Sequence, residues 1–152
     1  MKILVVCFGN ACRSPMLTAL LKSEINSREL LDQIKVESAG VKEKDPTPAS
    51  DNARETMRER GIDISSHRSR NVKGVPDLKE FDHIYCMEQG QVDTLIQMGV
   101  DPNRVHLANA GKGGVPNPYP QGMDVYRACA DVLEDVAKDI VDELTRELNA
   151  TK

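Results

Sequence analysis

Short apolar runs and stripes of helix-spaced apolar residues alternate along this chain. The runs are rich in Val, Ile and Leu, which is typical of buried strands. Strands are predicted over residues 2–6, 34–38, 82–87 and 104–107. Helices are predicted after residue 14, over 49–60 and 89–98, and in a last segment whose apolar residues recur every three or four positions. That last apolar face comprises Tyr126, Cys129, Leu133, Val136, Ile140 and Leu144.

Boundary residues sharpen these predictions. Ser14 can cap the free amides of a helix start and Pro15 tolerates the first turn, so a helix is expected to begin there. Gly61 is expected to end the helix over 49–60 as a left-handed cap. The pair Ala39-Gly40 is expected to end the second strand.

Strands that alternate with helices predict an α/β fold, a three-layer sandwich in which a central four-stranded parallel sheet carries helices on both faces. The length of 152 residues fits one domain over 1–152. Ligands of such sheets bind at the carboxyl ends of the strands. We therefore expect the function to lie in the loops that follow the strands.

Composition narrows the classes of function. Aromatic residues make up only 3% of the chain and Trp is absent, so the core must be mostly aliphatic. The net charge is −4 with both signs mixed along the chain, which argues against a nucleic-acid partner. The apolar run in MKILVV is too short for a signal peptide or a membrane span, so we expect a cytoplasmic protein without a membrane partner.

The four cysteines need an explanation other than disulfides or metal. They are Cys7, Cys12, Cys86 and Cys129, and a reducing compartment does not favour a disulfide framework. No Cys-x-x-Cys or His pair has metal-ligand spacing, so no metal or cofactor is expected. Cys86 ends a predicted strand and Cys129 lies on an apolar helix face, so both are expected in the core.

The stretch CFGNACRSP, residues 7–15, joins the first strand to the first helix. Gly9 and Asn10 permit left-handed backbone, so the amides of this loop can converge on one point at a helix N-terminus. Such a nest binds anions. Arg13 adds a planar fork that matches two oxygens of a phosphate. The sequence therefore predicts a site for a tetrahedral oxyanion such as phosphate.

Cys7 lies at the centre of this predicted site. The positive potential there favours the thiolate form of a cysteine. A thiolate beneath a phosphate, with Arg13 holding the equatorial oxygens, is the arrangement that phosphoryl transfer to sulfur requires. The alternative is that Cys7 is only a small buried side chain of the core, because the Cys-x₅-Arg spacing also arises by chance. A Walker loop is excluded because no Gly-Lys-Ser/Thr follows, and the dinucleotide-binding glycine pattern is also absent.

CFGNACRSP closely resembles the signature of the low-molecular-weight protein tyrosine phosphatase family. Further family landmarks follow in the right order: ESAG (37–40), ERGIDISSHRSR (59–70), FDHIYCM (81–87) and VPNPY (115–119). The resemblance implies a phosphotyrosine-containing protein as substrate and no cofactor. It implies that Cys7 is the nucleophile, that Arg13 clamps the phosphate, and that Ser14 hydrogen-bonds the thiolate.

The resemblance also assigns the remaining loop and rim residues. It implies that Asn10, Ser14, Ser38 and His67 form a polar network that holds the loop in its left-handed shape. Without it, a solvated loop histidine would be the simpler interpretation of His67. The other residues that the resemblance places around the phosphate and the aryl group are Phe8, Gly9, Ala11, Cys12 and Tyr119.

The chain departs from the family at Asn117. Family members carry Asp-Pro there, and that aspartate protonates the leaving phenolate. An amide cannot supply a proton, and general acid–base catalysis contributes about 10²–10⁴-fold. Three interpretations stay open: a slow phosphatase, substitution by Asp124, or a phosphate-binding relative or engineered trap that holds phosphotyrosine without turnover. For Asp124 the bland alternative is a charge at a helix N-terminus.

Other details leave further alternatives open. In relatives a cysteine at the position of Cys12 can form a reversible disulfide with the nucleophile, which would protect it from oxidation; the alternative is a passive small residue. Pro120 replaces a family aromatic, so a shallower aryl pocket is expected.

Two other enzyme classes share this loop. Arsenate reductases need extra cysteines near the third strand, where only Cys86 lies. Protein arginine phosphatases resemble the segment 117–129, although they favour threonine where Ala11 stands.

Overall fold

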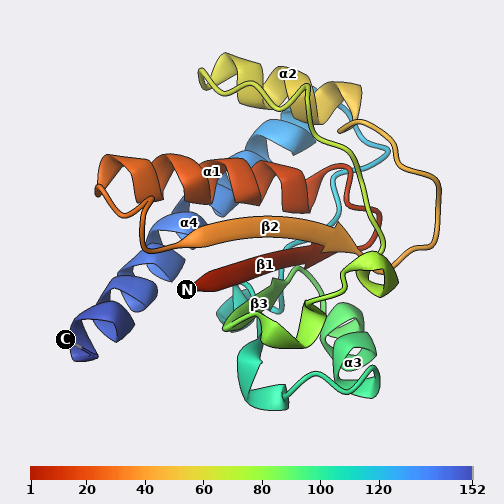
Figure 1. The fold of residues 1–152 in the computed structure, drawn as a ribbon. Helices are drawn as coiled ribbons and strands as arrows, with labels where there is room; N and C mark the ends of the chain where they lie inside the picture. The colour runs from red at the N-terminus through yellow and green to blue at the C-terminus, as the bar shows by residue number, and fades with distance from the viewer. Residues whose placement is uncertain (152) are drawn as a thin grey trace.

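The computed structural model describes residues 1–151 and contains one parallel four-stranded sheet (Figure 1). Its strands are β1 (Lys2–Cys7), β2 (Lys35–Gly40), β3 (His83–Cys86) and β4 (Val105–Leu107). Their order across the sheet is β2-β1-β3-β4. Val6 of the central strand β1 lies between Ala39 of β2 and Cys86 of β3. The carboxyl ends of these three strands therefore meet at one edge.

Helices cover both faces of the sheet. They are α1 (Arg13–Ser27), α2 (Asp51–Glu59), α3 (Gln89–Gln97) and α4 (Met123–Ala150). Helices α1 and α2 lie on one side of the sheet in Figure 1 and α3 lies on the other. Helix α4 packs against α1 and α2. This arrangement confirms the predicted three-layer α/β sandwich.

Alternate residues of β1 supply the two halves of the core. Ile3 and Val5 pack into the cluster formed with α1, α2 and α4, whereas Leu4 and Val6 pack into the cluster beneath α3. All four side chains are fully buried. Because both faces of β1 are covered, its continuous apolar run is the sequence that a central parallel strand requires.

One predicted strand end was wrong. β2 runs through Ala39 and Gly40 and does not stop before them, and Gly40 pairs with Cys7 in the parallel ladder. A Cβ on Gly40 would lie 2.7 Å from Phe8 O and 2.9 Å from Asn10 N, closer than such atoms approach. Glycine is therefore needed here because the backbone after β1 passes directly over it, and the ladder continues.

One predicted helix start was also displaced. Helix α1 begins at Arg13 with Cys12 at the capping position, and no side chain caps it. Ser14 lies inside the first turn, where its hydroxyl serves the loop before the helix and not the helix amides. By contrast, Ser50 caps α2 by accepting a hydrogen bond from Ala53 N, and Gly61 ends that helix region with φ +78° as expected.

Four short 3₁₀ segments connect the main elements. They are Val72–Gly74, Leu78–Glu80, Pro102–Arg104 and Ala110–Lys112. Among residues 1–151, no helix combines the length and the apolar character needed to cross a bilayer.

Candidate active site

The loop between β1 and α1 forms the floor of a cavity of about 420 Å³ at the carboxyl edge of the sheet. The loop contributes Cys7, Phe8, Gly9, Ala11, Cys12 and Arg13 to the cavity lining. The segment after β2 contributes Lys42, Lys44, Thr47, Pro48 and Ser50. The segment before α4 contributes Asn117 and Tyr119. Three parts of the chain that are distant in sequence thus enclose one site.

Cys7 is the last residue of β1 and its side chain is nearly fully buried at the base of this cavity. Asn10 N–H donates a hydrogen bond to Cys7 Sγ at 3.2 Å, and Ser14 Oγ lies 3.0 Å from the same sulfur. Ser14 Oγ accepts a hydrogen bond from Asn10 Nδ2 at 2.7 Å, so its own hydrogen is free to point at the sulfur. Cys7 therefore receives hydrogen bonds from a backbone amide and a hydroxyl.

Asn10 holds the loop together. It adopts a left-handed backbone with φ 54°, and its side chain is completely buried. Its Nδ2 donates to Ser14 Oγ and to Ser38 Oγ, the latter at 3.0 Å, while its Oδ1 accepts from Arg70 N at 3.0 Å. Every polar atom of this side chain has a partner. These hydrogen bonds offset the cost of burying the polar amide group and fix the conformation of the turn.

His67 supports the same turn from outside the cavity. Its Nε2 donates to Asn10 O at 2.7 Å, which fixes the tautomer of the neutral ring. Burial lowers the pKa of His67, and the nearby Arg68 and Lys44 lower it further. The structure thus brings Asn10, Ser14, Ser38 and His67 into one hydrogen-bonded network.

Arg13 lies at the first turn of α1 and its side chain is only 1% exposed. Its Nη1 donates to Val115 O at 2.7 Å and lies 2.6 Å from Glu88 Oε1. Among residues 1–151, no hydrogen bond engages its Nε or Nη2. The guanidinium is therefore held from one side and keeps donors for a ligand in the cavity.

Sequence reasoning missed Glu88. This residue follows β3 and precedes α3, where Glu88 and Gln91 form a reciprocal capping box. Its position in the sequence could have indicated this role, because Glu88 follows the strand next to β1 and the ends of adjacent parallel strands lie together. Its carboxylate faces the only arginine of the loop.

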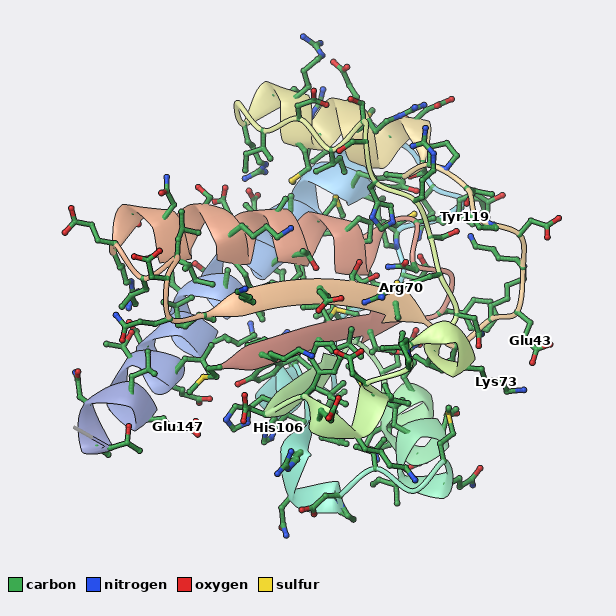
Figure 2. The ribbon with its side chains drawn as sticks, viewed as in Figure 1. Glu43, Arg70, Lys73, His106, Tyr119 and Glu147 are labelled. Atoms are coloured by element: carbon green, nitrogen blue, oxygen red, sulfur yellow. The ribbon has the colours of Figure 1, made fainter. Side chains whose placement is uncertain are left out.

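Asn117, Tyr119 and Phe8 are exposed residues at the rim of the cavity. Tyr119 is 64% exposed and Phe8 is 48% exposed, so two aromatic rings border the opening. Figure 2 shows Tyr119 projecting at the end of the molecule toward which the strands point. Asn117 Oδ1 accepts a hydrogen bond from Tyr119 N at 3.1 Å. Asp124 does not line the cavity; its fully exposed carboxylate lies 3.5 Å from Arg127 Nη1.

Cys12 lines the cavity but is largely buried, and its sulfur has two hydroxyl neighbours that the sequence did not suggest. Tyr126 Oη lies 3.2 Å and Ser50 Oγ 3.3 Å from Cys12 Sγ. Burial raises the pKa of Tyr126 to about 12, so the phenol keeps its proton near neutral pH. Helix α4 thereby contacts the loop between β1 and α1 through a side chain that was predicted only as core.

The remaining cysteines, Cys86 and Cys129, do not line the cavity. Cys86 is fully buried and burial raises the pKa of its thiol to about 12, while burial raises that of Cys129 to about 11. Both were predicted in the core, and both are buried there. Among residues 1–151, no group of three or more His, Cys, Asp or Glu side chains is arranged to hold a metal ion.

The fold and the loop define a class of enzyme, the protein phosphatases that carry a cysteine in a phosphate-binding loop. The sequence model described as low molecular weight phosphotyrosine protein phosphatase matches residues 2–150. The chain therefore belongs to this family, as its motifs predicted.

Individual relatives are similar over nearly their whole length. A protein-arginine-phosphatase of Geobacillus stearothermophilus is 30% identical over 96% of this chain and 97% of its own. The low molecular weight protein-tyrosine-phosphatase YfkJ of Bacillus subtilis is 30% identical over 90% of this chain and 96% of its own. The crystal structure of a protein tyrosine phosphatase from Entamoeba histolytica superimposes with a TM-score of 0.88 at 27% identity, covering 97% of this chain and 98% of that one.

Proposed function

We propose that this protein hydrolyses phosphotyrosine in proteins through a phosphocysteine on Cys7. The observation that carries the proposal is the surroundings of the Cys7 sulfur. It lies on the cavity floor at the N-terminal end of α1 and receives hydrogen bonds from Asn10 N–H and Ser14 Oγ. A sulfur held by hydrogen-bond donors on the floor of a cavity beside an arginine is placed to attack a bound phosphoryl group.

In the first step the Cys7 thiolate attacks phosphorus, the S–P bond forms and the P–O bond to the phenol breaks. The loop amides and the free Nε and Nη2 of Arg13 bind the oxygens of the transferring group. Glu88 and Val115 O hold the guanidinium from behind, so it needs no reorganisation when phosphate binds. Because Asn117 is an amide, the leaving phenolate takes its proton from water, and this step is slow.

In the second step water attacks the phosphocysteine and the S–P bond breaks. The hydroxyl of Ser14 lies 3.0 Å from the sulfur and stabilises the departing thiolate. Asn10 keeps this hydroxyl oriented, because it donates to Ser14 Oγ and leaves the hydroxyl hydrogen to the sulfur. The proton of the attacking water passes to solvent, since position 117 offers no base.

The cavity lining favours phosphotyrosine over phosphoarginine. Phe8 and Tyr119 offer flat apolar surfaces to a phenol ring. The charged residues that line the cavity are Arg13, Lys42 and Lys44, all cationic, and no carboxylate lines it. A phosphoarginine guanidinium would find no counter-ion there. Because this chain is similar to the protein-arginine-phosphatase of Geobacillus stearothermophilus, hydrolysis of phosphoarginine is the second candidate function.

The test compares kcat/KM on a phosphotyrosine peptide and on a matched phosphoarginine peptide, for the parent protein and for Cys7→Ser. We expect turnover of phosphotyrosine, no turnover by Cys7→Ser, and one phosphoryl group added to Cys7 in acid-quenched parent protein. A preference for phosphoarginine would establish the second candidate. Tight binding of phosphotyrosine with no turnover and no phosphocysteine would show a phosphotyrosine-binding relative instead.

A further inference from the structure

The segment that follows β2 places two lysines over the cavity. Residues 42–44 read Lys-Glu-Lys, and both lysines line the cavity. Glu43 between them pairs with Lys73, and Figure 2 shows this pair at the outer edge of the segment. Glu43 does not line the cavity, so the two ammonium groups face the site and the carboxylate between them faces away from it.

Backbone contacts anchor the segment on both sides of these lysines. Lys42 N donates to Phe8 O at 2.9 Å, which ties the segment to the phosphate loop. Further along, Thr47 N donates to Ser69 Oγ at 2.9 Å and Ser69 N donates to Thr47 O at 2.8 Å. Hydrogen bonds thus hold the segment at Lys42 and at Thr47, on either side of Lys44.

Each ammonium group has a defined place at the opening. Lys42 Nζ lies 5.7 Å from the centre of the Phe8 ring, on the exposed aromatic rim. A Cβ on Gly9 would lie 3.4 Å from Lys44 Nζ, so this ammonium rests over the phosphate loop itself. Among residues 1–151, neither lysine forms an ion pair, whereas Arg13 is neutralised by Glu88. Two uncompensated positive charges therefore flank the place where a phenol ring would lie.

We propose that Lys42 and Lys44 make this enzyme selective for phosphotyrosine that is flanked by acidic residues in the substrate protein. This inference rests on the proposed phosphotyrosine phosphatase activity. Carboxylates beside the phosphotyrosine would reach the rim of the cavity, where the lysines supply the missing counter-charge. The phosphoryl group itself is bound by the loop amides and Arg13 below.

The test uses a pair of phosphotyrosine peptides that differ only by Asp or Asn at the residues next to phosphotyrosine, together with phenyl phosphate. The measured quantity is the ratio of kcat/KM for the Asp peptide to that for the Asn peptide. We expect each of Lys42→Gln and Lys44→Gln to lower this ratio by about two- to fivefold, the effect of one partly exposed ion pair. Any effect of the lysines on the phosphoryl group itself is common to both peptides, so it cancels in the ratio and is measured separately with phenyl phosphate. Salt should lower the ratio for the parent protein by screening.

Lys138→Gln is the matched control, because it removes the same charge from an exposed position on α4. It should leave the ratio unchanged. The inference is overturned if the double lysine variant keeps the parent ratio, or if it loses activity equally on both peptides and on phenyl phosphate, which would make the lysines phosphate ligands. If the parent protein turns over no phosphotyrosine, the proposed function fails, and equal dissociation constants of Cys7→Ser for the two peptides would then also refute the acidic preference.

Discussion

Replacing Asn117 with Asp tests the account of the active site most directly. The two side chains have the same shape, and Asn117 Oδ1 already accepts a hydrogen bond from Tyr119 N at 3.1 Å. An aspartate can keep that bond with one oxygen and place the other oxygen where the amide nitrogen now lies. The substitution therefore adds a titratable proton at the rim of the cavity with little change in geometry.

The expected gain follows from the chemistry and from the position. General acid catalysis contributes about 10²–10⁴-fold. Residue 117 is exposed, and a hydrogen bond from Tyr119 N would favour the ionised carboxylate, so the aspartate holds its proton less well than a buried acid. We therefore expect the lower part of the range, an increase in kcat of about 10²–10³-fold, or about 3–4 kcal/mol of transition-state stabilisation.

The assay is kcat on a phosphotyrosine peptide and on a series of aryl phosphates whose phenols differ in pKa. Tyrosine has a pKa near 10, so its phenolate is a poor leaving group without an acid. The parent rate should fall steeply as the phenol becomes less acidic, and Asn117→Asp should flatten this dependence. The variant should also lose activity as its new carboxylic acid ionises with rising pH.

Two control variants show whether the proton comes from elsewhere. Asn117→Ala should resemble the parent protein, because the amide supplies no proton. Asp124→Asn should also resemble it, because that carboxylate is outside the cavity lining. A parent protein that is already fast, is insensitive to the leaving group and gains nothing from Asn117→Asp would have another source of the proton. Loss of activity in Asp124→Asn would then identify the acid.

Three further outcomes are expected. Glu88→Gln removes the carboxylate that pairs with the buried Arg13, so we expect the unfolding free energy to fall by about 1–3 kcal/mol. Urea titration measures this loss, and added phosphate should partly restore the stability. An unchanged urea midpoint would contradict the prediction. Burial lowers the pKa of His106, so the unfolded chain binds a proton at this histidine more tightly than the folded chain does. The unfolding free energy should therefore decline as pH falls below about 6.5, and His106→Gln should weaken that decline. The same pH dependence in the parent protein and in His106→Gln would show that His106 is not responsible. After peroxide treatment, a thiol reductant should restore the parent enzyme but not Cys12→Ser, if Cys12 protects Cys7 as a disulfide partner; equal recovery would make Cys12 a passive residue.

The sequence located the elements well because their signals are local. Val and Ile runs, helix-spaced apolar residues and Gly61 act within a few positions of the structure that they specify. The errors lie where a distant segment intervenes. Gly40 continues its strand because the backbone of Phe8 and Asn10 passes over it, and Ser14 enters the loop network because Asn10 donates to it.

The site, too, has parts that neighbouring residues specify and parts that distant segments supply. CFGNACRSP by itself determined the cysteine at the end of β1, the arginine and the loop that joins them, since these groups are neighbours in sequence. Only the tertiary structure brought Glu88 and Val115 to Arg13, the latter from 102 residues along the chain, and placed Lys42 and Lys44 over the loop. The reason is the strand order: with β1 at the centre of a parallel sheet, segments that follow its neighbours must meet at the same edge, whatever their distance in sequence.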